Sequence, residues 1–302
     1  MVRDGVATVS NGTDLAACDE SDAADTQPLA EEAAVVTPTR EVRTISPSSC
    51  GDFQRCPQLF KYRHDQPTPD MVRGTALHAV LNDLYELPRA NRTVEAVQDA
   101  FRAMWARERA AQWNAHLFAE PSAEREWGLK ALQLLENYFY LEEPAAQDPL
   151  WREKRLHVEF GDAGGAPSVA MNVTGILDRL DRGADGQLAV VDYKTGKAPT
   201  LKYSPAVNER IIREKFQQLK IYALLAQRVH GEMPRRLVLL YLDGPARLTM
   251  EVEPSILDET ERELWQTWHD IQRALATQHF PPRTSRLCDW CSFKPICPAF
   301  KS

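Results

Sequence analysis

Two aspartates and a lysine in the middle of the chain have residue types and spacing that could cleave a phosphodiester. Asp178 lies in one strand-like segment, and Asp192 and Lys194 lie two residues apart in the next one. If the two segments pair as a hairpin, Asp178 lies opposite residue 191 or 192, so the carboxylates are neighbours across the ladder. Asp192 and Lys194 share one face of their strand. A divalent cation would relieve the repulsion between the carboxylates, and the lysine could orient a water and offset negative charge developing on a phosphate.

This acid-x-Lys triplet is a weak signal by itself, because about one such triplet is expected by chance in a chain of this length and composition. The alternative is an exposed hairpin end that carries ordinary charge pairs. The apolar run Leu188–Val191 ends directly at Asp192. Charged residues at the end of a buried strand need partners that offset their desolvation, and this context favours a functional site.

Three further side chains could complete such a site, although each also has an ordinary explanation. His78 lies within a largely apolar helical segment and could be a buried structural histidine or a third cation ligand. Gln218 and Tyr222 lie four residues apart, on one face of a later helix. They could belong to an ordinary helix surface and core, or their amide and phenol groups could contact the strand that is cleaved. Taken alone, each residue favours the ordinary explanation.

Cysteines towards residue 297 have the spacing of metal ligands. Cys288 and Cys291 form a C-x2-C pair, and Cys297 follows after five residues. A tetrahedral site needs a fourth ligand; Cys56 is the best candidate and Cys50 is its competitor. The spacing does not choose between zinc and an iron–sulfur cluster. A site completed by Cys56 would join two distant segments and act as a structural clasp.

Hydrophobic periodicity predicts the elements that must position these residues. Ser46 and Pro47 are typical of a helix start, and one helix is expected to run from there to Tyr62. Further helices are expected over residues 71–87, 93–113, 123–141, 207–229 and 257–275, and strands over residues 156–160, 173–181, 188–193, 237–242 and 248–252. The chain is therefore expected to have a helical N-terminal part, then a mixed α/β core, then a cysteine-bearing segment.

Composition is typical of an intracellular globular protein. The 302 residues contain no apolar run long enough for a membrane helix and no N-terminal secretory pattern, so a cytoplasmic location with reduced thiols is expected. Most of the formal charge of −7 comes from residues 1–43, which lack aromatic residues and include Cys18. That segment is expected to be a disordered acidic tail; a partner-binding or DNA-mimicking tail is the alternative. Residues 44–302 are nearly neutral, so an anionic partner must meet a local basic patch.

In their order, these motifs resemble the RecB-like branch of the PD-(D/E)xK nuclease superfamily, and more closely its iron–sulfur members, such as Cas4 proteins and the AddB nuclease domain. The segments that carry the resemblance are Ser46-Pro47-Ser48 with Phe53 and Cys56-Pro57, Gly74 to His78, Gly175 to Asp178, Asp192-Tyr193-Lys194, Gln218 with Tyr222, and the cysteine triplet. The resemblance implies an α/β, restriction-endonuclease-like fold, with a mixed sheet flanked by helices. It implies one nuclease domain over 44–302, with a helical insert at about 90–145 and a cysteine segment, 281–302, whose cluster joins the N- and C-terminal parts.

The same resemblance assigns roles to the candidate residues. It implies that His78, Asp178 and Asp192 are cation ligands together with the Tyr193 carbonyl, and that Lys194 is the catalytic lysine. Gln218 and Tyr222 would lie beside the substrate strand. The four ligands of a [4Fe-4S] cluster, with zinc as the rival occupant, would be Cys56, Cys288, Cys291 and Cys297. The catalytic cation would be Mg²⁺ or Mn²⁺, and a histidine ligand makes Mn²⁺ a good rival because imidazole suits softer ions.

Two functions follow as expectations. The first is a divalent-metal-dependent deoxyribonuclease, an exonuclease on single-stranded DNA ends that acts in repair or recombination and leaves a 5′-phosphate. The second is a non-catalytic DNA-end-binding subunit that serves a helicase–nuclease or repair assembly. The near-neutral charge of residues 44–302 motivates the second, because phosphate contacts supply much of the affinity for DNA. The intact set of Asp178, Asp192 and Lys194 favours the enzyme.

Overall fold

The computed structural model describes residues 44–62, 68–111, 117–161 and 170–301. The acidic tail that the sequence predicts over residues 1–43, with Cys18, lies outside these described residues. Within the described ranges, no helix is both long enough and apolar enough to cross a membrane.

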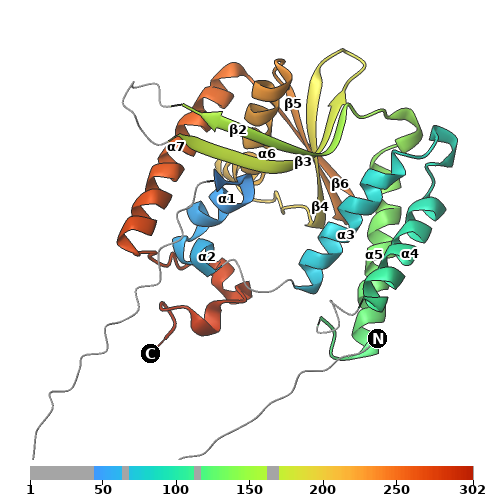
Figure 1. The fold of residues 1–302 in the computed structure, drawn as a ribbon, viewed down its shortest axis with the longest axis horizontal. Helices are drawn as coiled ribbons and strands as arrows, with labels where there is room; N and C mark the ends of the chain where they lie inside the picture. The colour runs from blue at the N-terminus through green and yellow to red at the C-terminus, as the bar shows by residue number, and fades with distance from the viewer. Residues whose placement is uncertain (1–43, 63–67, 112–116, 162–169, 302) are drawn as a thin grey trace, which may run out of the picture. The chain divides into compact units, whose positions relative to one another are not determined.

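A six-stranded mixed sheet forms the centre of the described chain (Figure 1). Its strands are β1 (Thr44–Ile45), β2 (Trp151–Phe160), β3 (Met171–Arg182), β4 (Leu188–Lys197), β5 (Arg236–Asp243) and β6 (Ala246–Glu251). The order across the sheet is β1-β3-β4-β5-β6, and β2 also pairs with β3. The β1–β3 and β4–β5 pairs are parallel and the other pairs are antiparallel.

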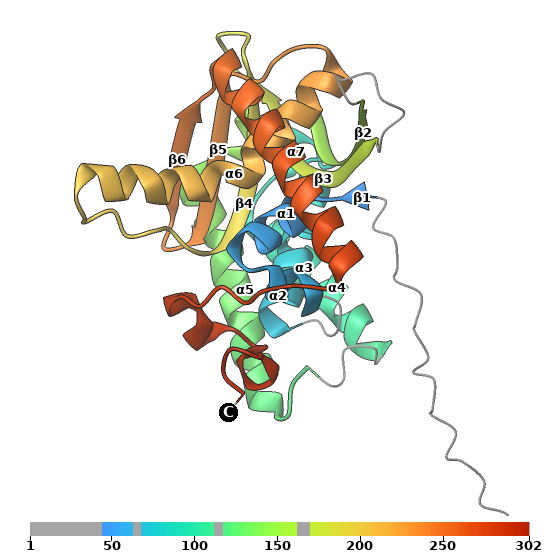
Figure 2. The same ribbon diagram turned by 90° about the vertical axis from the view of Figure 1, so that its left-hand side faces the viewer.

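Helices cover both faces of this sheet (Figures 1 and 2). They are α1 (Pro47–Arg55), α2 (Pro57–Tyr62), α3 (Pro69–Leu84), α4 (Val94–Ala110), α5 (Pro121–Leu141), α6 (Pro205–His230) and α7 (Pro254–Thr277), with short 3-10 helices η1 (Arg89–Asn91), η2 (Pro144–Ala146), η3 (Arg286–Trp290) and η4 (Lys294–Ile296). One hydrophobic core lies between the sheet and α1, α6 and α7. A second core lies between the sheet and α3, α4 and α5. The expected α/β class, with a mixed sheet flanked by helices, is therefore confirmed.

The sequence predicts one helix from Ser46 to Tyr62, but the structure divides this segment into α1 and α2. Ser46 caps α1 as expected, because its hydroxyl accepts a hydrogen bond from the Ser49 backbone N–H. Cys56 then takes an extended conformation with φ −163°, since a residue that precedes proline disfavours helical dihedrals and Pro57 follows. The single-helix prediction is therefore wrong at this point. Because of the break, Cys56 does not continue the helical path of α1.

The strands β3 and β4 separate at the two aspartates. They pair from Arg182 and Leu188 as far as Arg179 and Val191, and Asp178 and Asp192 are the next residue on each strand. The backbone N–H of Tyr193 donates a hydrogen bond to Asp178 Oδ2 at 2.9 Å. The predicted hairpin is confirmed, and the two aspartates lie at the fork where its ladder ends.

A buried arginine joins the fork to α3 and α5. Arg179 is 1% exposed, and its guanidinium donates hydrogen bonds to three tyrosine hydroxyls, those of Tyr85, Tyr138 and Tyr193. Two acidic residues neutralise it: Glu142 at 2.7 Å and Asp181 at 2.8 Å. Because a buried charge is tolerated only when it is paired and hydrogen-bonded, this network holds both helices against the sheet.

Candidate active site

His78, Glu153 and Asp178 form a group at the fork that could hold a metal ion. Their ligand atoms all lie within 4.8 Å of one another. His78 Nδ1 is 3.3 Å from Asp178 Oδ1 and 3.6 Å from Glu153 Oε1. The Nε2 atom of the same ring is 3.1 Å from the Tyr193 carbonyl oxygen. The structure therefore brings together His78, Asp178 and the Tyr193 carbonyl, and it adds Glu153.

The position of His78 depends on α3. Thr68 caps this helix, since its hydroxyl accepts a hydrogen bond from the Met71 N–H, and Pro69 suits the first turn. The buried leucines of α3, among them Leu77 and Leu81, pack in the same core as Val191 of β4. This packing brings His78 against the strand that carries Asp192.

Asp192 and Lys194 lie beside this group on β4. Lys194 Nζ is 2.7 Å from Asp192 Oδ2 and donates a hydrogen bond to Gln218 Oε1 at 3.1 Å. These two residues alternate with Tyr193, so they face α6, whereas the Tyr193 side chain packs in the core next to α3 and α5. Asp192 is 4% exposed, and the Lys194 side chain is 32% exposed. The ammonium group can therefore meet a substrate while the carboxylate beside it is held within the protein.

Burial and neighbouring charges shift two pKa values at the fork. Burial lowers the pKa of His78, but the charge of Asp178 and its hydrogen bond outweigh burial, and with Glu153 and Asp192 they raise that pKa to about 10. Burial raises the pKa of Asp192 to about 6, against the opposing effect of Lys194. The carboxylates around His78 therefore favour a positive charge at the fork, which a protonated imidazole or a bound cation could supply.

The donor set at the fork fits a divalent cation. Glu153 Oε1 is buried and has no hydrogen-bond partner among the described residues. Carboxylate oxygens with one imidazole suit Mg²⁺ or Mn²⁺. A bound cation would take over the positive charge from the imidazole, since a histidine must lose its proton to become a ligand.

Gln218 and Tyr222 present one face of α6 to the same fork. Burial raises the pKa of Tyr222, and the charges of Asp178 and Asp192 add to the rise, so the phenol keeps its proton. Tyr222 packs closely on β3: a Cβ atom added at Gly175 would lie 2.8 Å from Tyr222 Cε1 and 3.0 Å from Pro47 Cδ. Only glycine at this position allows α1, β3 and α6 to approach so closely.

Gly175→Ala is expected to lower the free energy of unfolding by about 1–3 kcal/mol, because overpacking forces neighbouring groups to shift. Urea denaturation followed by circular dichroism measures this change. Gly128→Ala on α5 is the matched control, because a Cβ at Gly128 meets nothing within 4 Å and alanine favours a helix. Equal stability of the Gly175→Ala variant and the unsubstituted protein would contradict the close approach.

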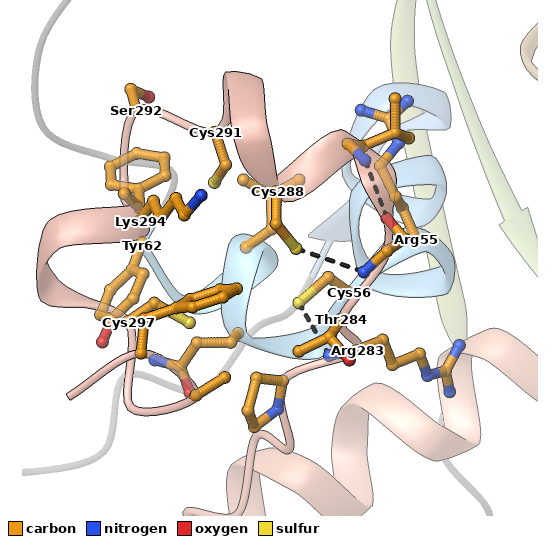
Figure 3. Close-up of a pocket in the computed structure, with 18 of the residues that line it drawn as sticks. Arg55, Cys56, Tyr62, Arg283, Thr284, Cys288, Cys291, Ser292, Lys294 and Cys297 are labelled. Atoms are coloured by element: carbon orange, nitrogen blue, oxygen red, sulfur yellow. Dashed lines mark hydrogen bonds between the residues drawn. The ribbon is translucent and has the colours of Figure 1, made fainter. Parts of the chain in front are cut away.

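The four candidate cysteines line one cavity of about 320 Å³ between α2 and the segment after α7 (Figure 3). One comes from the break after α1, one from η3, and one each from the residue after η3 and the residue after η4; they are Cys56, Cys288, Cys291 and Cys297. Two of the sulfur atoms accept hydrogen bonds from backbone N–H groups: Cys56 Sγ from Arg283 and Cys288 Sγ from Ser285, each at 3.3 Å. The Tyr62 hydroxyl donates to the Ile296 carbonyl at 3.2 Å. The cavity wall therefore joins two segments that are more than 200 residues apart in the chain.

Cys50, the competitor of Cys56, lies elsewhere. It is 0% exposed and belongs to the core between the sheet and α1, α6 and α7. Burial raises the pKa of its thiol to about 12, which disfavours the thiolate that metal ligation requires. Of the two candidates, Cys56 is the one that faces the cavity.

Comparisons with known proteins identify the family. A model of the PD-(D/E)XK nuclease superfamily matches residues 44–298. The chain belongs to this superfamily. It is also 23% identical over 285 residues to the Gene 69 protein of Mycobacterium phage D29, covering 85% of this chain and 97% of that protein.

Two solved structures resemble this PD-(D/E)XK nuclease. SSO0001 has 17% sequence identity and a TM-score of 0.40, covering 87% of this chain and 89% of that one. A candidate exonuclease from Eubacterium rectale has 13% identity and a TM-score of 0.47, covering 86% and 90%. The superfamily match confirms the restriction-endonuclease-like fold, and a PD-(D/E)XK protein of this kind is a metal-dependent nuclease.

Glu153 is the residue at the fork of this PD-(D/E)XK nuclease that the sequence does not reveal. It lies in a run of four charged residues, Arg152 to Arg155, at the start of β2, which is typical of an exposed strand end. Its contact with His78 depends on a local backbone conformation, φ +40°, and no residue type at this position signals it.

Proposed function

We propose that this chain is a deoxyribonuclease that removes nucleotides from single-stranded DNA ends, in repair or recombination. The observation that supports it is the convergence of Asp178, Asp192 and Lys194 with His78 at the β3–β4 fork. Carboxylates and an imidazole can hold a divalent cation, and an ammonium group beside them can offset negative charge on a phosphate. Membership of the PD-(D/E)XK superfamily supports the same reaction class.

In this proposal His78, Asp178 and Asp192 hold the cation, together with the Tyr193 carbonyl. The 3.1 Å between His78 Nε2 and the Tyr193 oxygen is compatible with two neighbouring ligands of one ion. A divalent cation supplies positive charge to a phosphate oxygen and lowers the pKa of a water molecule. Mg²⁺ is the abundant candidate, and Mn²⁺ is favoured by the imidazole.

The other residues of the site act on the substrate strand. Lys194 is proposed to orient the attacking water and to offset negative charge on the phosphate, since its ammonium group is partly exposed at the fork. Gln218 keeps Lys194 in place through their hydrogen bond. Tyr222 keeps its proton, so its hydroxyl can donate to a phosphate or sugar oxygen.

End-labelled single strands, blocked in turn at the 5′ and 3′ terminus, test the proposal in Mg²⁺ and in Mn²⁺. We expect digestion that depends on the metal and stops when one particular terminus is blocked; the Asp192→Asn variant, purified in parallel, is the control for contaminating nucleases. Digestion that proceeds equally whichever terminus is blocked would indicate an endonuclease. DNA binding without hydrolysis in either metal would instead favour the end-binding subunit of a helicase or repair assembly.

We also propose that the cysteine cavity holds a [4Fe-4S] cluster with a structural role. Four cysteines around one cavity support a shared metal site. The backbone N–H groups of Arg283 and Ser285, which donate to Cys56 Sγ and Cys288 Sγ, would stabilise thiolate ligands. Iron and acid-labile sulfide analysis of anaerobically purified protein tests this. Stoichiometric zinc without acid-labile sulfide would show that the cysteines hold zinc and not an iron–sulfur cluster.

Cys288→Ser is expected to reduce the bound metal and to lower the melting temperature by several degrees, because the clasp between α2 and the segment after α7 is lost. The rate of cleavage per folded molecule is expected to change little, since this residue is not part of the fork. Cys18→Ser is the matched control. A Cys288→Ser protein with unchanged metal content and melting temperature would contradict the structural role.

A further inference from the structure

Glu153 has an unusual backbone conformation for a residue within a strand. Its φ is +40°, and it is one of two non-glycine residues with positive φ among those the structure describes. The β2–β3 pairing is regular on both sides, with Arg152 opposite Arg179 and Lys154 opposite Leu177. Glu153 is therefore the single interruption, directly across from Asp178. Such a conformation is unfavourable and persists where surrounding structure demands it, often at functional sites.

The interruption brings the Glu153 carboxylate to His78. Glu153 Oε1 lies 3.6 Å from His78 Nδ1, is buried, and has no hydrogen-bond partner among the described residues. The opposite nitrogen of the ring, Nε2, faces the Tyr193 carbonyl at 3.1 Å. The two sides of the imidazole therefore have different surroundings, with the main chain of β4 on one side and carboxylates on the other.

We propose that Glu153 is a positioning residue that accepts a hydrogen bond from His78 Nδ1–H and so directs Nε2 to the catalytic cation. This inference rests on the proposed role of His78 as a cation ligand. A metal-binding histidine commonly donates its second N–H to a carboxylate, which fixes the tautomer and the ring orientation. Asp178 is nearer to Nδ1, at 3.3 Å, but its other oxygen already accepts the Tyr193 N–H and it is itself a proposed ligand. Glu153 is therefore the carboxylate that is available to accept the Nδ1–H of His78.

Calorimetric titration of the full-length protein with Mn²⁺ tests this role without reference to cleavage. We expect Glu153→Ala to weaken Mn²⁺ binding by about 10–100-fold, the usual effect of losing such a supporting carboxylate. Glu153→Gln should bind Mn²⁺ within about threefold of the unsubstituted protein, because its amide oxygen still accepts the Nδ1–H. Glu159→Gln, an exposed change on the same strand, is the matched control and should have no effect.

Three outcomes separate the possibilities. If His78→Ala leaves Mn²⁺ affinity unchanged, the assigned cation site is wrong and the inference fails with it. If His78→Ala weakens binding but Glu153→Ala does not, only the positioning role is overturned. If Glu153→Gln loses as much affinity as Glu153→Ala, the negative charge itself is needed, so Glu153 is a ligand and the positioning role is again overturned.

A second variant, Glu153→Gly, tests the backbone strain, and its melting temperature shows whether a loss of Mn²⁺ binding comes from misfolding. Glu153→Gly should raise the melting temperature of the cation-free protein, because glycine adopts positive φ without strain, while it weakens Mn²⁺ binding as Glu153→Ala does. A purely structural role for the side chain predicts the opposite, a lower melting temperature. A lower melting temperature of Glu153→Gly would overturn the link between the strained conformation and the cation site.

Discussion

Lys194→Ala is expected to lower the turnover number for DNA cleavage by about 10²–10³-fold, the typical loss when one preorganised donor is removed from the site of developing charge. The ammonium group lies 2.7 Å from Asp192 and is a partly exposed positive charge at the fork. A hydrogen bond from Lys194 Nζ to Gln218 Oε1 holds the ammonium group in this position. Initial rates on labelled single-stranded DNA at saturating substrate and Mg²⁺ measure the change.

The control for this substitution is Lys197→Ala, which removes the same charge from an exposed position three residues later on β4. It should alter the apparent substrate affinity at most, and its effect should fade at high salt because phosphate contacts are screened. Both variants should keep the circular dichroism spectrum of the unsubstituted protein. A turnover number for Lys194→Ala equal to that of Lys197→Ala would remove Lys194 from the catalytic assignment.

Arg179→Met is expected to cause the largest loss of stability, about 3–5 kcal/mol in the free energy of unfolding. Methionine fills a similar volume but leaves the buried carboxylates of Glu142 and Asp181 without their counter-charge. Three tyrosine hydroxyls lose a donor in the same step. Denaturation in guanidinium chloride, with the slope checked for two-state behaviour, measures the loss.

Arg182→Met on the same strand provides the comparison. Its ion pair with Glu232 is about 40% exposed on both side chains, and exposed ion pairs contribute little to stability. The two arginines thus differ in burial and not in strand or residue type. A loss for Arg179→Met no greater than that for Arg182→Met would show that the buried network is not what holds α3 and α5 to the sheet.

Much of the site could be predicted because its geometry is local. Two aspartates on either side of a short turn must face each other once the hairpin forms, and residues two apart on a strand must share a face. The same reasoning places Gln218 and Tyr222 on one side of α6. Such relations depend on helix and strand periodicity, which the sequence shows directly.

Other features depend on contacts that periodicity does not encode. The network around Arg179 joins residues from α3, α5, β3 and β4, so no short stretch of sequence indicates it. Glu153 reaches His78 through a positive φ that no residue type in the neighbouring sequence signals. The break at Cys56 is different, because Pro57 disfavours helical dihedrals in the residue before it and the sequence already contained that signal.

The hydrogen bond from the Arg283 N–H to Cys56 Sγ joins residues 227 positions apart. This separation affects the order in which the two residues become available during synthesis. The ribosome delivers α1 early and Arg283 much later, and a domain folds as a unit once its segments are available. A product that ends before Arg283 therefore contains both aspartates but lacks the donor that bonds to Cys56 Sγ. In such a product the residues of the fork are present before the segment that bonds to the end of α1.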